Sequence, residues 1–207
     1  MHMKTKLQYI SQGSSLPEQE SNILRALQAG VDWVQVRWKQ ASEQDLLQLC
    51  LNVKRYCVVY NAVCIINDHV LLAKEISADG VHLGLEDGAV ADARRLLGPG
   101  KIIGGTANTL QDVQQRIAEQ CDYIGLGPFA FTTTKDKLSP VLGMDGYRDI
   151  CRYFSERQEI IPPVYAIGGI GLEDIPALMQ TGIYGIAVSG LITRCPELVS
   201  HIKTILQ

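Results

Sequence analysis

Cations and an amide stand at alternate positions in one short segment, Gln35-Val36-Arg37-Trp38-Lys39. In an extended chain the side chains of Gln35, Arg37 and Lys39 lie on one side. Arginine can grip phosphate oxygens with two parallel hydrogen bonds, and lysine adds a point charge. The spacing therefore predicts a phosphate or diphosphate site, with a solvated Arg/Lys strand edge as the alternative.

A second anion-binding pattern begins at Gly127-Pro128 and ends in Thr132, Thr134 and Lys135. A glycine turn, threonine hydroxyls and one cation are suited to hold a diphosphate. Lys135 or Lys39 could form a Schiff base instead, but the hydroxyls and cations around them favour anion binding. The segment 128–143 is long enough for a lid, and we expect it to close over bound diphosphate.

Two acids follow successive apolar segments, Asp68 after Val63-Cys64-Ile65-Ile66 and Asp87 shortly after His82-Leu83. Taken alone, Asp68 is better explained as a helix cap. Two carboxylates from adjacent strands can approach one another, however, and beside a basic phosphate site they fit Mg²⁺ held by few protein ligands plus substrate oxygens. For His82 we expect a packed core position.

Glycines and hydroxyls mark the remaining segment ends. Gly168 and Gly169 follow one apolar segment, and Ser189 follows Val188 at the end of the next. Backbone N–H groups in such turns surround a monophosphate in many barrel enzymes. Thr109 is of the residue type that caps a helix, and Thr106, three residues before it, could face the same end of the fold as these turns. The sequence thus predicts one basic, metal-linked anion site and one neutral site built from backbone donors, with no nucleophilic triad.

The elements that would position these residues alternate from end to end. Several of the strands are almost wholly apolar, as parallel strands covered on both faces are. The expected strands are Leu7–Ile10, Asp32–Val36, Ala62–Ile66, Gly80–Leu83, Lys101–Gly104, Tyr123–Gly127, Val164–Gly168 and Gly185–Val188. The expected helices span 20–29, 43–57, 69–77, 88–97, 110–119, 144–157, 172–180 and 196–206. This order predicts an α/β fold, a single (β/α)₈ TIM barrel over 1–207. The alternative, an open doubly wound sheet, lacks its GxGxxG turn.

Composition excludes several classes of function. The net charge of −3, with no basic run, argues against nucleic acid as a partner. No apolar stretch approaches the roughly 20 residues of a membrane span. The six cysteines form no CxxC pair, so we expect reduced thiols in a cytoplasmic protein without a cysteine-bound metal. Small molecules are the expected partners. The sequence is compatible with a homo-oligomer as well as with a monomer.

With these motifs in order, the chain resembles the thiamine phosphate synthase (thiamine-phosphate pyrophosphorylase) family over nearly its whole length. The resemblance rests on Gln35-x-Arg37-x-Lys39, Asn67-Asp68, Ala78-Asp79-Gly80-Val81-His82-Leu83-Gly84 with Glu86-Asp87, Tyr123-Ile124-Gly125-Leu126-Gly127-Pro128, Thr132-x-Thr134-Lys135 and Ala166-Ile167-Gly168-Gly169-Ile170.

The resemblance implies a transferase that condenses amino-substituted hydroxymethylpyrimidine diphosphate with hydroxyethylthiazole phosphate, giving thiamine phosphate and pyrophosphate. It implies a dissociative reaction, in which diphosphate leaves first and a pyrimidine carbocation is attacked by the thiazole nitrogen. Mg²⁺ would be bound by Asp68 and Asp87. The residues implied for catalysis are Arg37, Lys39, Thr106 and Lys135. Those implied for substrate binding are Gln35, Arg37, Lys39, Asn67, Thr106, Thr132, Thr134, Lys135, Gly169, Val188 and Ser189.

Two departures from the family pattern stand out: Leu71 replaces a usual acid, and the segment around Val188-Ser189 is one residue shorter than in some relatives. The alternatives are a thiazole tautomerase, in which a histidine would stand at Asn108, a non-catalytic barrel that binds thiazole phosphate, and a phosphoribosyl isomerase. The last would need an acid/base pair that the sequence does not offer.

Overall fold

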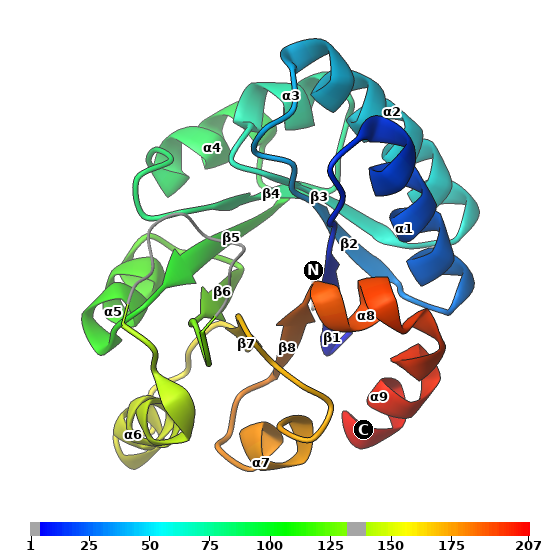
Figure 1. Cartoon of the computed structure of the whole chain (residues 1–207). Coiled ribbons are helices and arrows are strands. Elements are labelled where there is room, and N and C mark those ends of the chain that lie inside the picture. The colour runs from blue at the N-terminus through cyan, green and yellow to red at the C-terminus, as the bar shows by residue number, and fades with distance from the viewer. Residues whose placement is uncertain (1–4, 132–139) are drawn as a thin grey trace.

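Eight parallel strands close into a barrel in the order β1 to β8 (Figure 1). The structure is a computed structural model, and it describes residues 5–131 and 140–207. The strands are β1 (Leu7–Ile10), β2 (Trp33–Val36), β3 (Val63–Asn67), β4 (Gly80–Leu83), β5 (Ile102–Ala107), β6 (Tyr123–Leu126), β7 (Val164–Ile167) and β8 (Gly185–Val188). The predicted (β/α)₈ barrel is confirmed.

Helices surround the strands in Figure 1. They are α1 (Leu16–Gln28), α2 (Glu43–Val59), α3 (Val70–Glu75), α4 (Val90–Leu97), α5 (Leu110–Ala118), α6 (Gly143–Glu156), α7 (Ile175–Met179), α8 (Gly190–Arg194) and α9 (Val199–Ile205), with the 3₁₀ turn η1 (Pro196–Leu198) before α9. Within the two described ranges, none of these helices is long and apolar enough to cross a membrane.

Local capping residues explain where the main helices begin. The Ser42 side chain accepts from the N–H of Asp45 at the start of α2, as expected. Thr109 and Asp112 form a reciprocal capping box at α5. Helix α1 starts four residues before the expected position, because Ser15 caps it and a proline is tolerated in its first turn.

The side chains of each strand divide between two cores. One set faces the helices and forms the larger apolar layer. The alternate set fills the barrel with Ile10, Trp33, Ile65, Ile102, Tyr123, Tyr165 and Ala187. The rings of Trp33 and Tyr123 pack edge to face with centroids 4.9 Å apart, and those of Trp33 and Tyr165 lie 5.0 Å apart. The interior is therefore solid at this level, and open space is confined to the strand ends.

Aspartates stand directly before three of the even-numbered strands, at the amino end of the barrel, which we call the base. Asp32 pairs with Lys203 (2.9 Å) before β2, and Asp79 with Lys54 (2.9 Å) before β4. Asp122 pairs with Arg94 before β6. The Asp79 and Asp122 carboxylates also accept backbone N–H bonds from the preceding strands. Asp79 and Asp122 thus each tie an odd strand to the even strand after it, and all three acids tie the start of an even strand to a helix.

The six cysteines carry free thiols, four of them buried. Burial raises the pKa of Cys50 to about 12 and, as the main cause, that of Cys121 to about 11. Such thiols stay protonated near neutral pH and are poor nucleophiles. They belong to the core.

Candidate active site at the carboxyl ends of the strands

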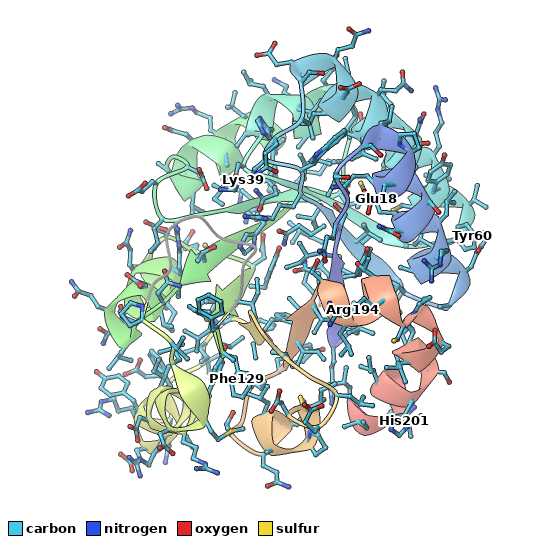
Figure 2. All side chains as sticks on the ribbon, viewed as in Figure 1. Glu18, Lys39, Tyr60, Phe129, Arg194 and His201 are labelled. Carbon is cyan, nitrogen blue, oxygen red and sulfur yellow. The ribbon has the colours of Figure 1, made fainter. Side chains whose placement is uncertain are left out.

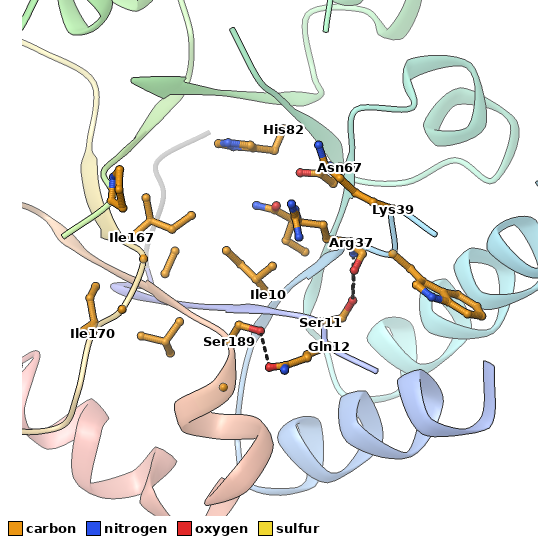
Figure 3. A pocket seen from close by; sticks show the side chains of 18 of the residues that line it. Ile10, Ser11, Gln12, Arg37, Lys39, Asn67, His82, Ile167, Ile170 and Ser189 are labelled. Carbon is orange, nitrogen blue, oxygen red and sulfur yellow. Dashed lines mark hydrogen bonds between the residues drawn. The ribbon is translucent and has the colours of Figure 1, made fainter. Parts of the chain in front are cut away.

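A pocket of about 660 Å³ opens at the carboxyl ends of the strands, which we call the mouth. Figure 3 shows the polar side chains of Arg37, Lys39 and Asn67 along one wall, with Ile167 and Ile170 on the opposite wall. The lining includes eight of the residues that the sequence singles out: Gln35, Arg37, Lys39, Asn67, Thr106, Gly169, Val188 and Ser189. Segments far apart in the chain therefore meet in one cavity.

The cationic wall begins where β2 ends. Gln35 is buried inside the barrel, and the strand stops at Val36. Ser11, from the end of β1, holds the next residue by accepting from the N–H of Arg37 at 2.9 Å. The expected alternation holds: Trp38 packs against the helix-facing apolar layer that contains Val36, although it also borders the pocket that Arg37 and Lys39 line.

The carboxylates of Asp68 and Asp87 hydrogen-bond to one another, as their positions on adjacent strands predict. Asp68 has a left-handed backbone (φ 66°) and donates its N–H to the carbonyl of His82 at 2.9 Å. Asp87 accepts the N–H of Gly84 at 2.8 Å. Asp68 does not cap α3, because His69 occupies the cap position there. The simpler capping interpretation of Asp68 is therefore wrong.

Below about pH 6 this pair holds one proton, on Asp68. Burial, then the hydrogen bond and repulsion from Asp87, raise the pKa of Asp68 to about 6, although Lys39 and Arg37 oppose the rise. Burial also disfavours ionisation of Asp87, but hydrogen bonds from Asp68 and Gly84 hold its pKa below the usual range. Below about pH 6 a neutral acid thus lies against an ionised one.

The carboxylate pair adjoins the pocket through Lys39, whose Nζ lies 3.7 Å from Oδ2 of Asp68, and the two acids are not themselves part of the pocket lining. Carboxylate oxygens are the ligands that Mg²⁺ prefers, usually one or two of them with water and substrate oxygens. Within the described ranges no group of three or more acids, histidines or cysteines could hold a metal. The donor set therefore fits Mg²⁺ completed by substrate oxygens rather than a closed protein site.

The far end of the pocket is formed by the turns after β7 and β8. Gly168 and Gly169 have left-handed backbones (φ 90° and 71°), and a β-carbon on Gly169 would meet Ala130. The Ala130 N–H donates to the Gly168 carbonyl at 3.0 Å. Ser189, after β8, donates to Oε1 of Gln12 at 3.3 Å (Figure 3).

Two residues at this end were missed by sequence reasoning. Gln12 follows β1, and Arg194 is the last residue of α8. The Arg194 guanidinium lies against Gly190 and has no hydrogen bond or ion pair among residues 5–131 and 140–207. Figure 2 labels Arg194 and Lys39 at separate places, and both residues line the same pocket. The predicted neutral anion site therefore has a cation beside it.

Three further predicted residues, Thr132, Thr134 and Lys135, lie outside the described residues, as does half of the expected lid, residues 132–139. Thr106 lies within β5 rather than in a turn after it. Asn108, which follows β5, donates to the carbonyl of Gly127 and is buried.

Barrels of this kind keep their active sites at the carboxyl ends of their strands, and this mouth gathers groups that bind anions. The class defined by fold and site is therefore a TIM-barrel enzyme with an anion-binding mouth.

Comparisons with known proteins give the family. The family model described as thiamine monophosphate synthase matches residues 9–192. The thiamine-phosphate synthase of Flavobacterium psychrophilum is 57% identical over 192 residues, covering 93% of each chain. That of Flavobacterium johnsoniae is 54% identical, covering 94% of this chain and 92% of the relative. The solved thiamine phosphate pyrophosphorylase of Pyrococcus furiosus superposes with a TM-score of 0.80 at 26% identity, covering 98% and 97% of the two chains. The chain belongs to the thiamine monophosphate synthase family and is a transferase of thiamine biosynthesis.

Proposed function

We propose that this enzyme condenses amino-substituted hydroxymethylpyrimidine diphosphate with hydroxyethylthiazole phosphate, giving thiamine phosphate and pyrophosphate. The observation that carries the proposal is the pair of anion-binding ends in one pocket. Arg37 and Lys39, with the carboxylate pair, stand at one end, and the turns after β7 and β8 at the other. Two phosphorylated substrates could then meet between them.

At the first end, Arg37 and Lys39 would bind the diphosphate directly. Asp68 and Asp87 would hold Mg²⁺, which would neutralise charge on the leaving diphosphate. Lys135, Thr132 and Thr134 belong to the same proposal from the sequence pattern. Cations at this end favour departure of diphosphate before the new bond forms.

Between the two ends, Gln35, Asn67 and Thr106 would orient the pyrimidine ring. The carbocation left after diphosphate departs is attacked by the thiazole nitrogen, so the chain's main task is to align two reactants and stabilise charge. Such a dissociative reaction needs little acid–base chemistry, which agrees with a sequence that offers no triad.

At the second end, Gly169, Val188 and Ser189 would surround the thiazole phosphate, with Arg194 close enough in the pocket to add charge. The tautomerase alternative is not favoured, because Asn108 stands where its histidine would and is engaged with Gly127. The proposal also includes a cytoplasmic location, as the sequence suggested. It allows association of copies into a homo-oligomer.

A turnover assay tests the proposal. Both substrates are supplied with Mg²⁺ and then after chelation, and thiamine phosphate and pyrophosphate are measured together. We expect equal amounts of the two products with Mg²⁺ and a large loss without it. Binding of thiazole phosphate without product would instead support the tautomerase or a binding barrel.

The matched control for this assay is Asp149→Asn, which removes an exposed carboxylate that pairs with Arg152 on the surface of α6. It should leave turnover and its dependence on Mg²⁺ unchanged. Equal losses in this variant and in Asp87→Asn would argue against a site at the carboxylate pair.

A further inference from the structure

A chain of side-chain hydrogen bonds crosses the barrel beneath the pocket. Nε2 of Gln35 donates to Oε1 of Gln8 (3.1 Å), and Nε2 of Gln8 donates to the Tyr123 hydroxyl (3.3 Å). That hydroxyl meets Nδ1 of His82 at 3.0 Å, and Nε2 of His82 meets Oγ1 of Thr106 at 3.0 Å. Both ends of the chain, Gln35 and Thr106, line the pocket.

This series of hydrogen-bonded side chains is enclosed by the barrel, and a glycine beside it leaves the space that it occupies. Gln8, Gln35, His82 and Tyr123 are at most 4% exposed. A β-carbon on Gly104 would lie 2.6 Å from the Tyr123 hydroxyl, so glycine is needed there for the phenol to reach its partners. Buried polar side chains of this kind specify one arrangement when every member is bonded.

The hydrogen bonds run in one direction. Burial is the main cause that raises the pKa of Tyr123, so the phenol keeps its proton. Tyr123 accepts from Gln8, and its own proton needs an acceptor, which Nδ1 of His82 supplies at 3.0 Å, so we assign the ring proton to Nε2. That proton goes to the Thr106 oxygen, which leaves the Thr106 hydroxyl hydrogen for the pocket. At the other end the Gln35 amide nitrogen is used, so its carbonyl oxygen is the group for a ligand.

We propose that His82 and Tyr123 are positioning residues that hold Thr106 as a hydrogen-bond donor and Gln35 as an acceptor toward the pyrimidine. This inference rests on the proposed function. An aminopyrimidine offers the complementary pair, a ring nitrogen that accepts and an exocyclic amine that donates. The polarity of the binding site is thus set by Tyr123 and Gln8, which do not line the pocket, and by the ring of His82, which lies at its edge. Reversing both glutamine amides would reverse every bond and make Thr106 an acceptor, so the direction can be tested.

The tautomer of His82 is the direct test. The chain has only four histidines, so two-bond ¹H–¹⁵N NMR spectra of the ¹⁵N-labelled wild-type enzyme can be assigned. We expect the His82 proton on Nε2, and a changed His82 signal in Tyr123→Phe. Tyr165→Phe is the matched control, because its hydroxyl belongs to the same aromatic cluster but donates to the carbonyl of Thr5. A proton on Nδ1 would overturn the inference, whether or not any variant folds.

Kinetics test whether the hydrogen-bonded series of side chains affects the substrate through Thr106. Tyr123→Phe should raise KM for the pyrimidine diphosphate about tenfold, the usual effect of losing one buried hydrogen bond, with KM for thiazole phosphate unchanged. In a Thr106→Val background the same substitution should have almost no further effect. Additive losses, or an equal loss in Tyr165→Phe, would show that Tyr123 only stabilises the fold and would overturn the inference.

The failure of the two proposals can be told apart. Absence of thiamine phosphate from the wild-type enzyme would overturn the proposed function and this inference with it. Normal turnover with the proton on Nδ1, or with additive kinetics, would overturn this inference alone.

Discussion

The two ends of the barrel use the same types of charged residue in opposite ways: they are paired with one another at the base and left accessible to a ligand at the mouth. At the base, each aspartate before β2, β4 and β6 faces a lysine or arginine. At the mouth, Asp68 has a left-handed backbone and faces another carboxylate, with only a 3.7 Å contact to Lys39 to offset it among the described residues, and Arg194 has no partner among residues 5–131 and 140–207. Groups that are satisfied within the protein support the fold, whereas groups left unsatisfied are available to a ligand.

Residues at the mouth should therefore lower the stability of the fold and be essential to activity. Residues at the base should raise stability and have little effect on activity. The following substitutions test that contrast.

Asp68→Asn should have the largest effect. Loss of one metal-binding charge should lower kcat/KM by about 10²–10³-fold, the usual range for one group that stabilises developing charge. The same variant should be more stable without ligand at pH 8, by about 2 kcal/mol, since the pKa of Asp68 is raised to about 6 in the folded enzyme.

The sign follows from proton binding. Between pH 4 and about 6 the folded enzyme holds a proton on Asp68 that an unfolded chain has released, so stability falls as pH rises through that window. Asparagine has no such proton. Urea unfolding of both proteins at pH 4 and pH 8 checks this, and a loss of stability at pH 8 in the variant would contradict it.

Asp79→Ala should do the opposite. It removes the ion pair with Lys54 and leaves the Cys64 N–H without its acceptor, so the free energy of unfolding should fall by about 2 kcal/mol. Turnover at low temperature should not change. Asp79→Asn keeps an acceptor and is the control, with a loss of less than about 1 kcal/mol. A fall in kcat with Asp79→Ala would mean that the base influences the chemistry.

Arg194→Gln should have a moderate effect confined to one substrate. The guanidinium is at the edge of the pocket and exposed, so its loss should raise KM for thiazole phosphate about threefold to tenfold. KM for the pyrimidine diphosphate and the unfolding midpoint should stay as they are. Arg152→Gln, at an exposed pair on α6, is the control. An equal change in both KM values would remove Arg194 from the phosphate end.

Leu71→Glu should have the smallest effect. Leu71 is 71% exposed on α3 and does not line the pocket, so stability should change by less than about 0.5 kcal/mol. Turnover and its dependence on Mg²⁺ should also be unchanged. A tighter dependence on Mg²⁺ would show that a third acid reaches the carboxylate pair.

The sequence was sufficient for the parts that depend on local signals. Strand positions follow from apolar runs, and the starts of α2 and α5 from Ser42 and Thr109. The approach of Asp68 and Asp87 also followed, because adjacent parallel strands bring their carboxyl ends together.

The parts that could not be predicted depend on the closed barrel. His82 was expected to be a packed core residue, and it is buried, but its partners come from β5 and β6 and could not be read from its neighbours in the chain. Arg194 was missed because α8 has only five residues, too few for a periodic signal.

The aspartates at the base divide the barrel into four two-stranded quarters. Asp32, Asp79 and Asp122 precede β2, β4 and β6, and Tyr184 occupies the corresponding place before β8, with its ring 5.5 Å from that of Tyr165 on β7. In three quarters the start of the even strand is held to a helix (α9, α2 or α4) by an ion pair, and in the fourth it packs by aromatic contact. Ionic strength weakens charge pairs but not ring contacts, so concentrated salt acts unevenly around the circle. The quarter that salt affects least is the one whose turns carry Gly169 and Ser189.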